Sequence, residues 1–302
     1  MVDFKYIPIP NFPVGVVNAP RRAKRPHIES GRKCVFCPGG EKQDPDVFRI
    51  PARNASQSEA GGGGEDQDRN WQVRAVPNKY PFAPIHEVVV LTPEHTKHLS
   101  SLSVEQVRLG IEAFVSRYNS LKDKGTVCIF GNSGKEAGES IGHPHAQIAV
   151  VGDDVPVVVP RLEKDPEYRG ETFEVEDFEI ICPPYSQWPD EVWIVPKERG
   201  KEFGDITYKE IESLAIAWNT LIKIFELRHN RNFPHNFYIY PFKDWYLRII
   251  PRKKSIGGFE LETGIFVNTQ DPHETMQFIK DHYEEQSEEK IKKARASYRR
   301  GV

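Results

Sequence analysis

The sequence predicts an α+β protein of two similar halves, each an antiparallel sheet with packed helices. Two observations lead to this fold class. Apolar stretches of strand length alternate with amphipathic stretches of helical period. The second half of the chain then repeats the order of the first: an apolar strand, a proline, a polar turn and an amphipathic helix. Such a repeat indicates an internal duplication, so two halves of the same architecture are expected.

The first repeat can be followed element by element. Residues 53–70 are polar and glycine-rich with no period, and are interpreted as a loop. A phosphate-binding role for the four glycines would require a following helix with Lys-Ser/Thr, which the sequence lacks. The strands WQVRAVPN and EVVVLTP come next, then a helix from about Ser103 to Lys122 and the strand TVCIFGN. A last strand is expected within residues 139–150, ESIGHPHAQIAV.

An offset of 103 residues aligns the two halves, as for Pro93 and Pro196. The same offset relates four further pairs, Glu87 and Asp190, Phe130 and Phe233, His143 and Tyr246, and His145 and Arg248. An alignment without gaps over this span supports the duplication. The expected domains are an N-terminal half at residues 1–155 and a C-terminal half at residues 156–302.

Composition narrows the class of protein. A chain of 302 residues with 38% hydrophobic residues can bury a core. No apolar run approaches the roughly 18 residues of a membrane span, and the opening segment lacks the regions of a leader. The formal net charge of −3 gives no nucleic-acid signature, and the basic C-terminal stretch KIKKARASYRR is interpreted as a solvated helix face. A cytoplasmic protein without membrane or nucleic-acid partners is expected.

Four cysteines in a chain expected in the cytoplasm argue against a disulfide framework. Cys34 and Cys37 have the C-x2-C spacing with which two thiolates hold one metal ion, usually zinc. A single pair is half a site, so a redox pair and a chance spacing are alternatives. Cys128 and Cys182 lie in apolar runs and are expected to be buried as small hydrophobic residues.

Polar side chains alternate in the stretch HPHAQ. In an extended strand His143, His145 and Gln147 would point to one face. Ala146 and Ile148 would then form an apolar opposite face. The second repeat has tyrosine and arginine at the two histidine positions, so folding alone does not require imidazoles there. Ordinary core histidines are the structural alternative to a functional site.

These motifs together resemble the galactose-1-phosphate uridylyltransferase family, a two-domain branch of the histidine-triad superfamily. The order CVFC, TPEHTKHL and GESIGHPHAQ matches the family pattern, and APRRAKRP, VPNKYP and GGFELETG extend the agreement over about the whole chain. Related sugar-nucleotide phosphorylases share most of these motifs. The resemblance implies two histidine-triad-like halves, the first with a zinc site and the H-P-H-x-Q nucleophile, the second with a degenerate motif and sugar contacts.

The resemblance also assigns roles to residues. It implies one structural zinc site with the ligands Cys34, Cys37, His95 and His143. His145 would attack the α-phosphorus of a sugar nucleotide, release a sugar 1-phosphate and hold a nucleoside monophosphate. Gln147 would donate a hydrogen bond to the phosphoryl oxygens. With Tyr246 and Arg248 in the second copy, no second metal is expected.

Substrate contacts are implied for a further set of positions: Arg22, Arg25, Asn78, Asn132, Ser140, Gly258, Phe259 and Glu260. Guanidinium groups can neutralise a diphosphate, and the glycines of NSGKEAGES let backbone N–H groups approach phosphate. Surface arginines and an ordinary glycine-rich loop are the alternatives. Glu139 departs from the family, in which some members have cysteine at this position.

The implied function is an enzyme that moves UMP from UDP-glucose to galactose 1-phosphate, in a ping-pong reaction through a nucleotidyl-histidine. A sugar-nucleotide or dinucleoside-polyphosphate phosphorylase or hydrolase that uses the same histidine is the alternative. A zinc-stabilised nucleotide-binding module without turnover is a third hypothesis. The expected partners are a sugar nucleotide, a sugar 1-phosphate and a second copy of the chain in a homodimer.

Overall fold

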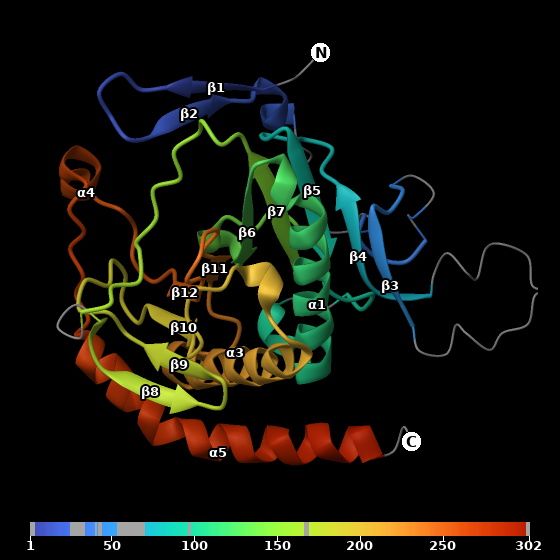
Figure 1. The fold of residues 1–302 in the computed structure, drawn as a ribbon, viewed down its shortest axis with the longest axis vertical. Helices are drawn as coiled ribbons and strands as arrows, with labels where there is room; N and C mark the ends of the chain where they lie inside the picture. Colours follow the sequence, from blue (N-terminus) through green and yellow to red (C-terminus); the bar gives the residue numbers. More distant parts are fainter. Residues whose placement is uncertain are drawn as a thin grey trace, which may run out of the picture.

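The computed structural model describes residues 4–24, 34–39, 41, 44–52, 70–95, 98–165 and 169–299, with side chains as far as residue 286. Its centre is one antiparallel ten-stranded sheet with the order β3-β4-β5-β7-β6-β11-β12-β10-β9-β8 (Figure 1). The first five strands are β3 (Phe48–Pro51), β4 (Trp71–Pro77), β5 (Ile85–Val90), β6 (Thr126–Ser133) and β7 (His145–Val151). The second five are β8 (Thr172–Val175), β9 (Phe178–Ile181), β10 (Val192–Pro196), β11 (His235–Ile239) and β12 (Leu247–Pro251). A separate hairpin contains β1 (Lys5–Pro8) and β2 (Gly15–Asn18).

Helices cover one face of the sheet. They are α1 (Val104–Leu121), α3 (Tyr208–His229) and α5 (Pro272–Arg299), and a short helix α4 (Gly258–Thr263) stands apart from them (Figure 1). Ser103 caps α1 by accepting from the Gln106 N–H at 3.1 Å, so the helix starts where the sequence predicts. The main hydrophobic core lies between these helices and the sheet. No helix in the described ranges has the length and apolarity needed to cross a membrane.

The α+β class and the duplication are confirmed by the strand order. Outward from the contact between β6 and β11, each half continues in the same way, as β6-β7-β5-β4-β3 and as β11-β12-β10-β9-β8. Val90 pairs with His145 in the first half, and Trp193 pairs with Arg248 in the second, both 103 positions later. The two sheets of the halves are joined edge to edge into one. The proposed boundary at residue 155 falls between β7 and β8.

The offset is not constant, however. In the ladders to β7 and β12, Gly131 and Phe237 hold equivalent places, which are 106 positions apart. The expected match of Phe130 with Phe233 is therefore wrong, and Phe130 corresponds to Asn236. The physical reason is the longer helix of the second half, because α3 has 22 residues and α1 has 18, and a comparison without gaps does not detect such an insertion.

The strand expected within 139–150 needs one correction as well. β7 begins at His145, so His143 lies in the turn before the strand. Pro144 has no N–H and cannot donate to a ladder, which explains why regular pairing starts after it. The alternation beyond this point is confirmed, because Ala146 and Ile148 belong to the core under the helices. His145 and Gln147 consequently face the side of the sheet away from that core.

Candidate active site and metal centre

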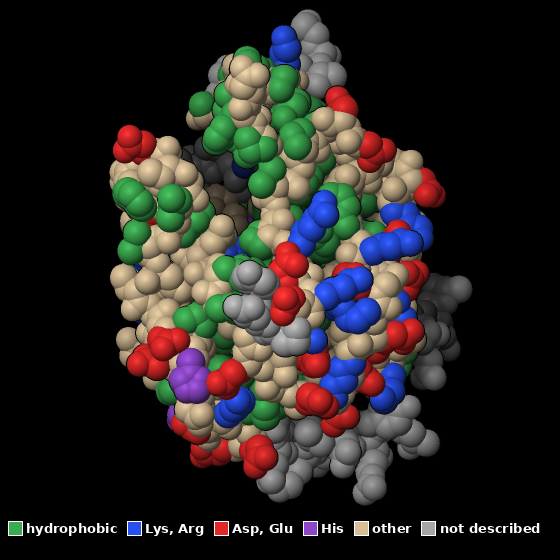
Figure 2. All heavy atoms as spheres, turned by 60° about the vertical axis from the view of Figure 1, so that its left-hand side comes forward, with side chains coloured by type: hydrophobic (Ala, Val, Ile, Leu, Met, Phe, Trp, Pro, Cys, Tyr) green, Lys and Arg blue, Asp and Glu red, His purple; other side chains and the backbone are tan. Residues whose placement is uncertain are grey.

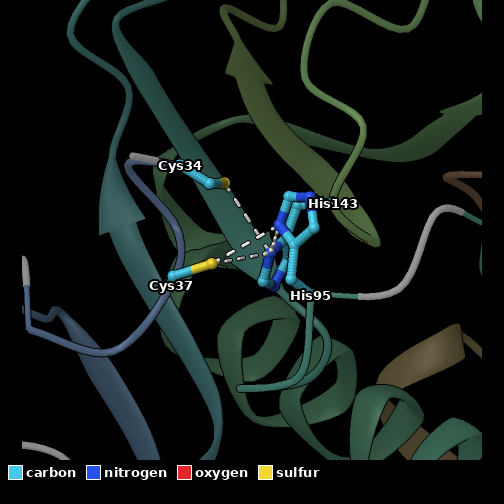
Figure 3. A group of neighbouring side chains, drawn as sticks. All are labelled: Cys34, Cys37, His95 and His143. Atoms are coloured by element: carbon cyan, nitrogen blue, oxygen red, sulfur yellow. Dashed lines mark hydrogen bonds between the residues drawn. The ribbon is translucent and has the colours of Figure 1, made fainter. Parts of the chain in front are cut away.

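Four potential metal ligands converge beside the start of β7. Cys34 and Cys37 come from the loop before β3, His95 follows β5, and His143 precedes β7 (Figure 3). Their ligand atoms all lie within 4.8 Å of one another. The C-x2-C pair is therefore joined by two imidazoles from other segments, as the family resemblance implies. This Cys2His2 cluster can hold one metal ion.

The spacing of these atoms fits a tetrahedral ion. Zinc bond lengths of about 2.3 Å to sulfur and 2.0 Å to nitrogen give tetrahedral edges of about 3.3 Å between nitrogens and about 3.6 Å between sulfur and nitrogen. The Nδ1 atoms of His143 and His95 are 3.4 Å apart. The Cys37 Sγ atom lies 3.4 Å from His95 Nδ1 and 3.8 Å from His143 Nδ1. The side chains are thus placed as tetrahedral zinc ligands would be.

The ring of His143 is held in the tautomer that a metal requires. Its Nε2–H donates to the Thr92 carbonyl oxygen at 2.8 Å, so Nδ1 keeps its lone pair for the cluster. Complete burial lowers the pKa of His143, and the neighbouring His95 lowers it further, against the effect of the Thr92 hydrogen bond. Both effects favour the neutral ring.

The cysteine loop is fastened to β4 by a buried carboxylate. Glu41 accepts from the Gly39 N–H at 2.7 Å and from Trp71 Nε1 at 2.9 Å. Arg74, which is 2% exposed, lies 3.6 Å from Glu41 and 3.0 Å from Asp46. A buried network of this kind fixes the loop that carries both thiolates. Neither Glu41 nor Arg74 was identified from the sequence.

His145 is arranged as a nucleophile. Its Nδ1–H donates to the His143 carbonyl oxygen at 2.8 Å, which leaves the lone pair on Nε2. The side chain is buried at 5% exposure, and its ring lies 5.2 Å from that of Phe36. Because the metal ligand His143 supplies this carbonyl, the cluster and the second histidine are mechanically connected. The ring is therefore oriented by the backbone of the metal centre.

Gln147 is oriented by His86, a residue that sequence reasoning missed. His86 Nδ1 accepts from the Phe82 N–H at 3.4 Å, so its Nε2–H donates to Gln147 Oε1 at 3.0 Å. The Gln147 amide nitrogen remains as a donor on the face that carries His145. A lone histidine in the apolar run IHEVVV resembles a core residue, and its role depends on a diagonal contact between β5 and β7.

Arg22 and Asn78 are brought to the same region. Arg22 Nη1 donates to the Tyr80 carbonyl oxygen at 2.6 Å, and its guanidinium lies 4.8 Å from the ring of Phe82. Asn78 accepts from the Tyr80 N–H at 2.9 Å, and its Nδ2 is a neighbour of His86 Nε2 at 3.2 Å, where two donors meet and no hydrogen bond forms in this tautomer. Both predicted substrate contacts are thus linked to the residues that orient Gln147.

Asn132 lies on β6, beside β7, and Ser140 lies in the loop that leads to His143. Asn132 Oδ1 accepts from Asn236 Nδ2 at 2.8 Å across the contact of the two halves. Glu139 accepts from the Gly134 N–H at 2.8 Å, and burial raises its pKa to about 7 against this hydrogen bond. Glu139 therefore closes the glycine-rich loop.

Three of the predicted contacts are not brought to this site, and a fourth cannot be placed. Arg25 lies outside the described residues. Gly258, Phe259 and Glu260 open α4, which stands apart from β7 in Figure 1. Glu260 is engaged within its own segment by Lys254 at 2.7 Å.

In the second half, tyrosine and arginine occupy the positions equivalent to His143 and His145. Tyr246 stacks on Trp193, with ring centroids 4.0 Å apart and an interplanar angle of 9°. Arg248 donates to Glu191 Oε2 at 2.6 Å and lies 5.8 Å from the Trp193 ring. These groups form a buried ion pair on an aromatic stack. The second copy therefore has no imidazole at the places equivalent to His143 and His145.

Comparison with known proteins agrees with this geometry. Residues 82–151 match the model of the galactose-1-phosphate uridyl transferase N-terminal domain. This part of the chain is thus similar to the galactose-1-phosphate uridylyltransferase family. It is 23% identical over 329 residues to an ADP-glucose phosphorylase of Arabidopsis thaliana, covering 88% of this chain and 89% of the relative. It is 26% identical over 273 residues to a galactose-1-phosphate uridylyltransferase of Thermotoga maritima, covering 81% and 82%.

A solved structure shows the same fold. The ADP-glucose phosphorylase of Arabidopsis thaliana with bound ADP-glucose superposes with a TM-score of 0.69 at 23% identity, covering 91% of this chain and 98% of the other. The relatives that this chain resembles are thus named both as a uridylyltransferase and as a phosphorylase.

Proposed function

We propose that this protein moves a nucleoside monophosphate from a sugar nucleotide to a second phosphate-bearing acceptor, through a covalent bond to His145. The observation that carries the proposal is the hydrogen bond from His145 Nδ1 to the His143 carbonyl oxygen at 2.8 Å. In the neutral ring this bond puts the proton on Nδ1 and the lone pair on Nε2, which is the nitrogen that would attack phosphorus.

The reaction follows from the positions of the side chains. His145 Nε2 bonds to the α-phosphorus, and the bond from that phosphorus to the bridging oxygen breaks, so that the sugar 1-phosphate leaves with the electron pair. The ring becomes cationic, and its Nδ1–H bond to the His143 carbonyl stabilises that charge. Gln147, with its oxygen held by His86, donates its amide N–H to a phosphoryl oxygen. The acceptor phosphate then reverses these steps.

The metal cluster has a positioning role in this proposal. A zinc ion held by Cys34, Cys37, His95 and His143 would have no open position, which is typical of structural sites. It would tie three segments together and hold the carbonyl that orients His145. Catalysis itself is assigned to the side chains of β7.

Two substrate pairs are supported by different observations. The family resemblance and the Thermotoga maritima relative support UDP-glucose with galactose 1-phosphate. The Arabidopsis thaliana relative, named an ADP-glucose phosphorylase, matches over a longer part of this chain and supports ADP-glucose with orthophosphate. We keep UMP transfer as the first candidate and ADP-glucose phosphorolysis as the second.

One panel of incubations tests the proposal. UDP-glucose, ADP-glucose and GDP-glucose are each incubated alone, with galactose 1-phosphate and with orthophosphate, and the products are separated by chromatography. Exchange of sugar 1-phosphates identifies a transferase, release of a nucleoside diphosphate identifies a phosphorylase, and release of a nucleoside monophosphate identifies a hydrolase. No conversion in any of the nine mixtures contradicts the proposal.

The homodimer and the cytoplasm remain proposals as well. Hydrophobic side chains gather on the β1–β2 hairpin and on the α4 projection, and the surface between them is hollowed (Figure 2). Phe12 is 60% exposed on the hairpin, and Leu261 is 75% exposed on α4. Exposure of this kind supports burial against a second copy. None of the four cysteines forms a disulfide bond in the described structure, which is consistent with a reducing compartment.

A further inference from the structure

Arg252, just after β12, is a cation to which the described part of the chain supplies no counter-charge. Other inward arginines are paired with carboxylates, as Arg74 is with Asp46 at 3.0 Å and Arg248 with Glu191 at 2.6 Å. Within the described ranges, Arg252 has no carboxylate oxygen within 4.0 Å. Its Nε atom is buried and has no hydrogen-bond partner among the described residues, which is also true of Arg74 Nε and Arg248 Nε. Arg252 differs from those two arginines in having no carboxylate beside it, so an anionic ligand is the acceptor that would complete its surroundings.

The guanidinium of Arg252 is nevertheless held in place. Its Nη1 donates to Asn236 Oδ1 at 3.2 Å, and its carbon lies 4.3 Å from the ring of Trp188, which is 7% exposed. The backbone N–H of Arg252 donates to the Pro234 carbonyl oxygen at 2.7 Å, which extends the ladder between β11 and β12. An arginine fixed by stacking and by one amide loses little entropy when it binds a ligand.

This arginine belongs to the face that carries the nucleophile. Asn236 pairs with Asn132 across the contact of β6 and β11, and their amides bond at 2.8 Å. The pairing of Gly131 with Ala146 places Asn132 opposite His145 on the next strand. Neighbouring strands are about 4.8 Å apart, so Asn236 stands roughly 10 Å from the strand of His145. The guanidinium is thus two strands from the reacting group.

We propose that Arg252, Asn236 and Asn132 form an anion subsite at the contact of the two halves, which binds the phosphate of the acceptor. The ligand class is a phosphate dianion, either orthophosphate or the phosphate of a sugar 1-phosphate. This inference rests on the proposed function, because it takes the nucleotidyl group on His145 as the partner of that phosphate. It assigns the second half a direct part in the reaction.

The donor set suits this ligand. Asn236 uses its oxygen for Arg252 and its nitrogen for Asn132 and for the Ala137 carbonyl oxygen, the latter two at 2.8 Å. The Asn132 oxygen is thereby occupied, so its amide nitrogen is the remaining donor. The Arg252 edge with the unpartnered Nε–H adds a charged donor that matches two phosphate oxygens. Together they offer donors without a carboxylate, as a dianion requires.

Binding of the phosphate alone is the first test. Orthophosphate and glucose 1-phosphate are titrated separately into the full chain by calorimetry, with the Arg252→Gln and Lys253→Gln variants in parallel. Lys253 is the matched control, because it is exposed, carries the same charge one residue away, and donates to the His229 carbonyl instead. Arg252→Gln should weaken binding about tenfold to a hundredfold, and Lys253→Gln should not. Equal affinities in all three proteins would overturn the subsite.

Discharge of the nucleotidyl-enzyme is the second test. The enzyme is labelled with a sugar nucleotide, freed of small molecules and mixed with orthophosphate, with glucose 1-phosphate or with buffer alone. Arg252→Gln should raise the concentration of acceptor needed for half-maximal discharge about tenfold to a hundredfold. The rate of discharge to water should stay unchanged, since water carries no anion for the subsite. The acceptor that saturates at the lower concentration identifies the source of the phosphate.

The two hypotheses fail in different ways. If phosphate binding depends on Arg252 while no nucleotidyl-enzyme forms, the subsite stands and the proposed function is wrong. If the nucleotidyl-enzyme forms and Arg252→Gln needs no more acceptor than the parent, the function stands and the subsite is wrong. Unchanged far-ultraviolet circular dichroism and metal content show that each variant is folded. Arg252→Lys keeps the positive charge but loses the bidentate guanidinium. Its affinity for phosphate should therefore lie between that of the parent and that of Arg252→Gln.

Discussion

The ring of Phe237 lies over Gly131, its partner across the contact of the two halves. The two residues are paired in the ladder of β6 with β11, and a Cβ on Gly131 would lie 2.1 Å from Phe237 Cε1. They also hold equivalent places in the duplicated halves, so the pseudo-twofold axis of the fold passes between them. At this axis only one of two equivalent positions can carry a large side chain.

Gly131→Ala should therefore destabilise the protein by about 1–3 kcal/mol, because the added methyl group overlaps a buried ring. Denaturation by urea measures the change. Gly258→Ala serves as the control, since a Cβ there would meet no atom within 4 Å. Replacing the ring in Gly131→Ala/Phe237→Leu should recover part of the loss. Equal stability of Gly131→Ala and the parent would disprove the close contact.

Metal analysis of the purified protein should find about one zinc per chain, since two thiolates and two imidazoles suit a closed tetrahedral site. Cys37→Ser should lose most of the metal and lower the melting temperature. Cys128→Ser should keep both, because Cys128 lies outside the cluster and burial raises its pKa to about 11. Full zinc content in Cys37→Ser would exclude the assigned ligands.

His145→Ala should abolish labelling of the protein by a sugar nucleotide that carries label in its α-phosphate. Turnover should fall by about four orders of magnitude, as for other deleted nucleophiles. The label on the parent should be labile in acid, as a phosphoramidate is. The exposed His273, which contacts Glu171, provides the control variant His273→Ala. Intersecting initial-rate lines, or labelling of His145→Ala, would refute the covalent mechanism.

His86→Phe keeps an aromatic ring beside Phe82 and removes the donor to Gln147. We expect kcat to fall about tenfold to a hundredfold with little change in KM, because the amide of Gln147 loses its orientation in the transition state. Gln147→Ala should cost about a hundredfold to a thousandfold. His86→Gln should restore part of the rate.

The combined variant shows how His86 acts. If His86 acts through Gln147, His86→Phe/Gln147→Ala should be no slower than Gln147→Ala alone. If the reductions in kcat of the two single variants multiply in the combined variant, His86 has a separate role in the reaction.

Glu139→Gln should retain activity within about tenfold, since no step assigned to His145 and Gln147 uses this carboxylate. Its effect should appear in the pH dependence of stability. The folded protein binds a proton on Glu139 up to about pH 7, whereas the unfolded chain releases it near pH 4.5. The parent should lose stability relative to Glu139→Gln as the pH rises across this window.

For a fully buried carboxyl, each unit of pKa shift changes the free energy of unfolding by about 1.4 kcal/mol across the pH window. Glu139 is partly exposed, so the expected change is smaller. Urea denaturation at a series of pH values measures the difference between the two proteins. A difference that is constant from pH 4.5 to 7 would show that the pKa of Glu139 is not raised. A thousandfold loss of activity would give Glu139 a catalytic role.

Short-range patterns in the sequence predicted a large part of this site. The C-x2-C spacing and the H-P-H motif are local, so the resemblance that they carry is enough to name the four metal ligands and His145. The duplication predicted the fold class, because strand and helix recur in one order. The register of β6 against β11 could not be predicted in this way, since it depends on the extra residues of helix α3, which change the offset between the two halves.

Contacts between distant segments were beyond sequence reasoning. Glu41 and Arg74 are separated by 33 positions and meet only because β4 folds beside the cysteine loop. His86 on β5 contacts Gln147 on the neighbouring strand β7 diagonally. Arg252 is connected to the first half only through Asn236, which pairs with Asn132 across the contact of the two halves.

The ten-stranded sheet also constrains how the enzyme can move. β6 and β11 are joined by a ladder from Ile129 with Ile239 to Ser133 with His235, and one hydrophobic core continues beneath both halves. A hinge between the halves would have to break that ladder and divide the core. Exchange of donor and acceptor therefore should not require closure of one half onto the other. The strands of the sheet would keep a fixed geometry, and the motion would be that of loops beside them.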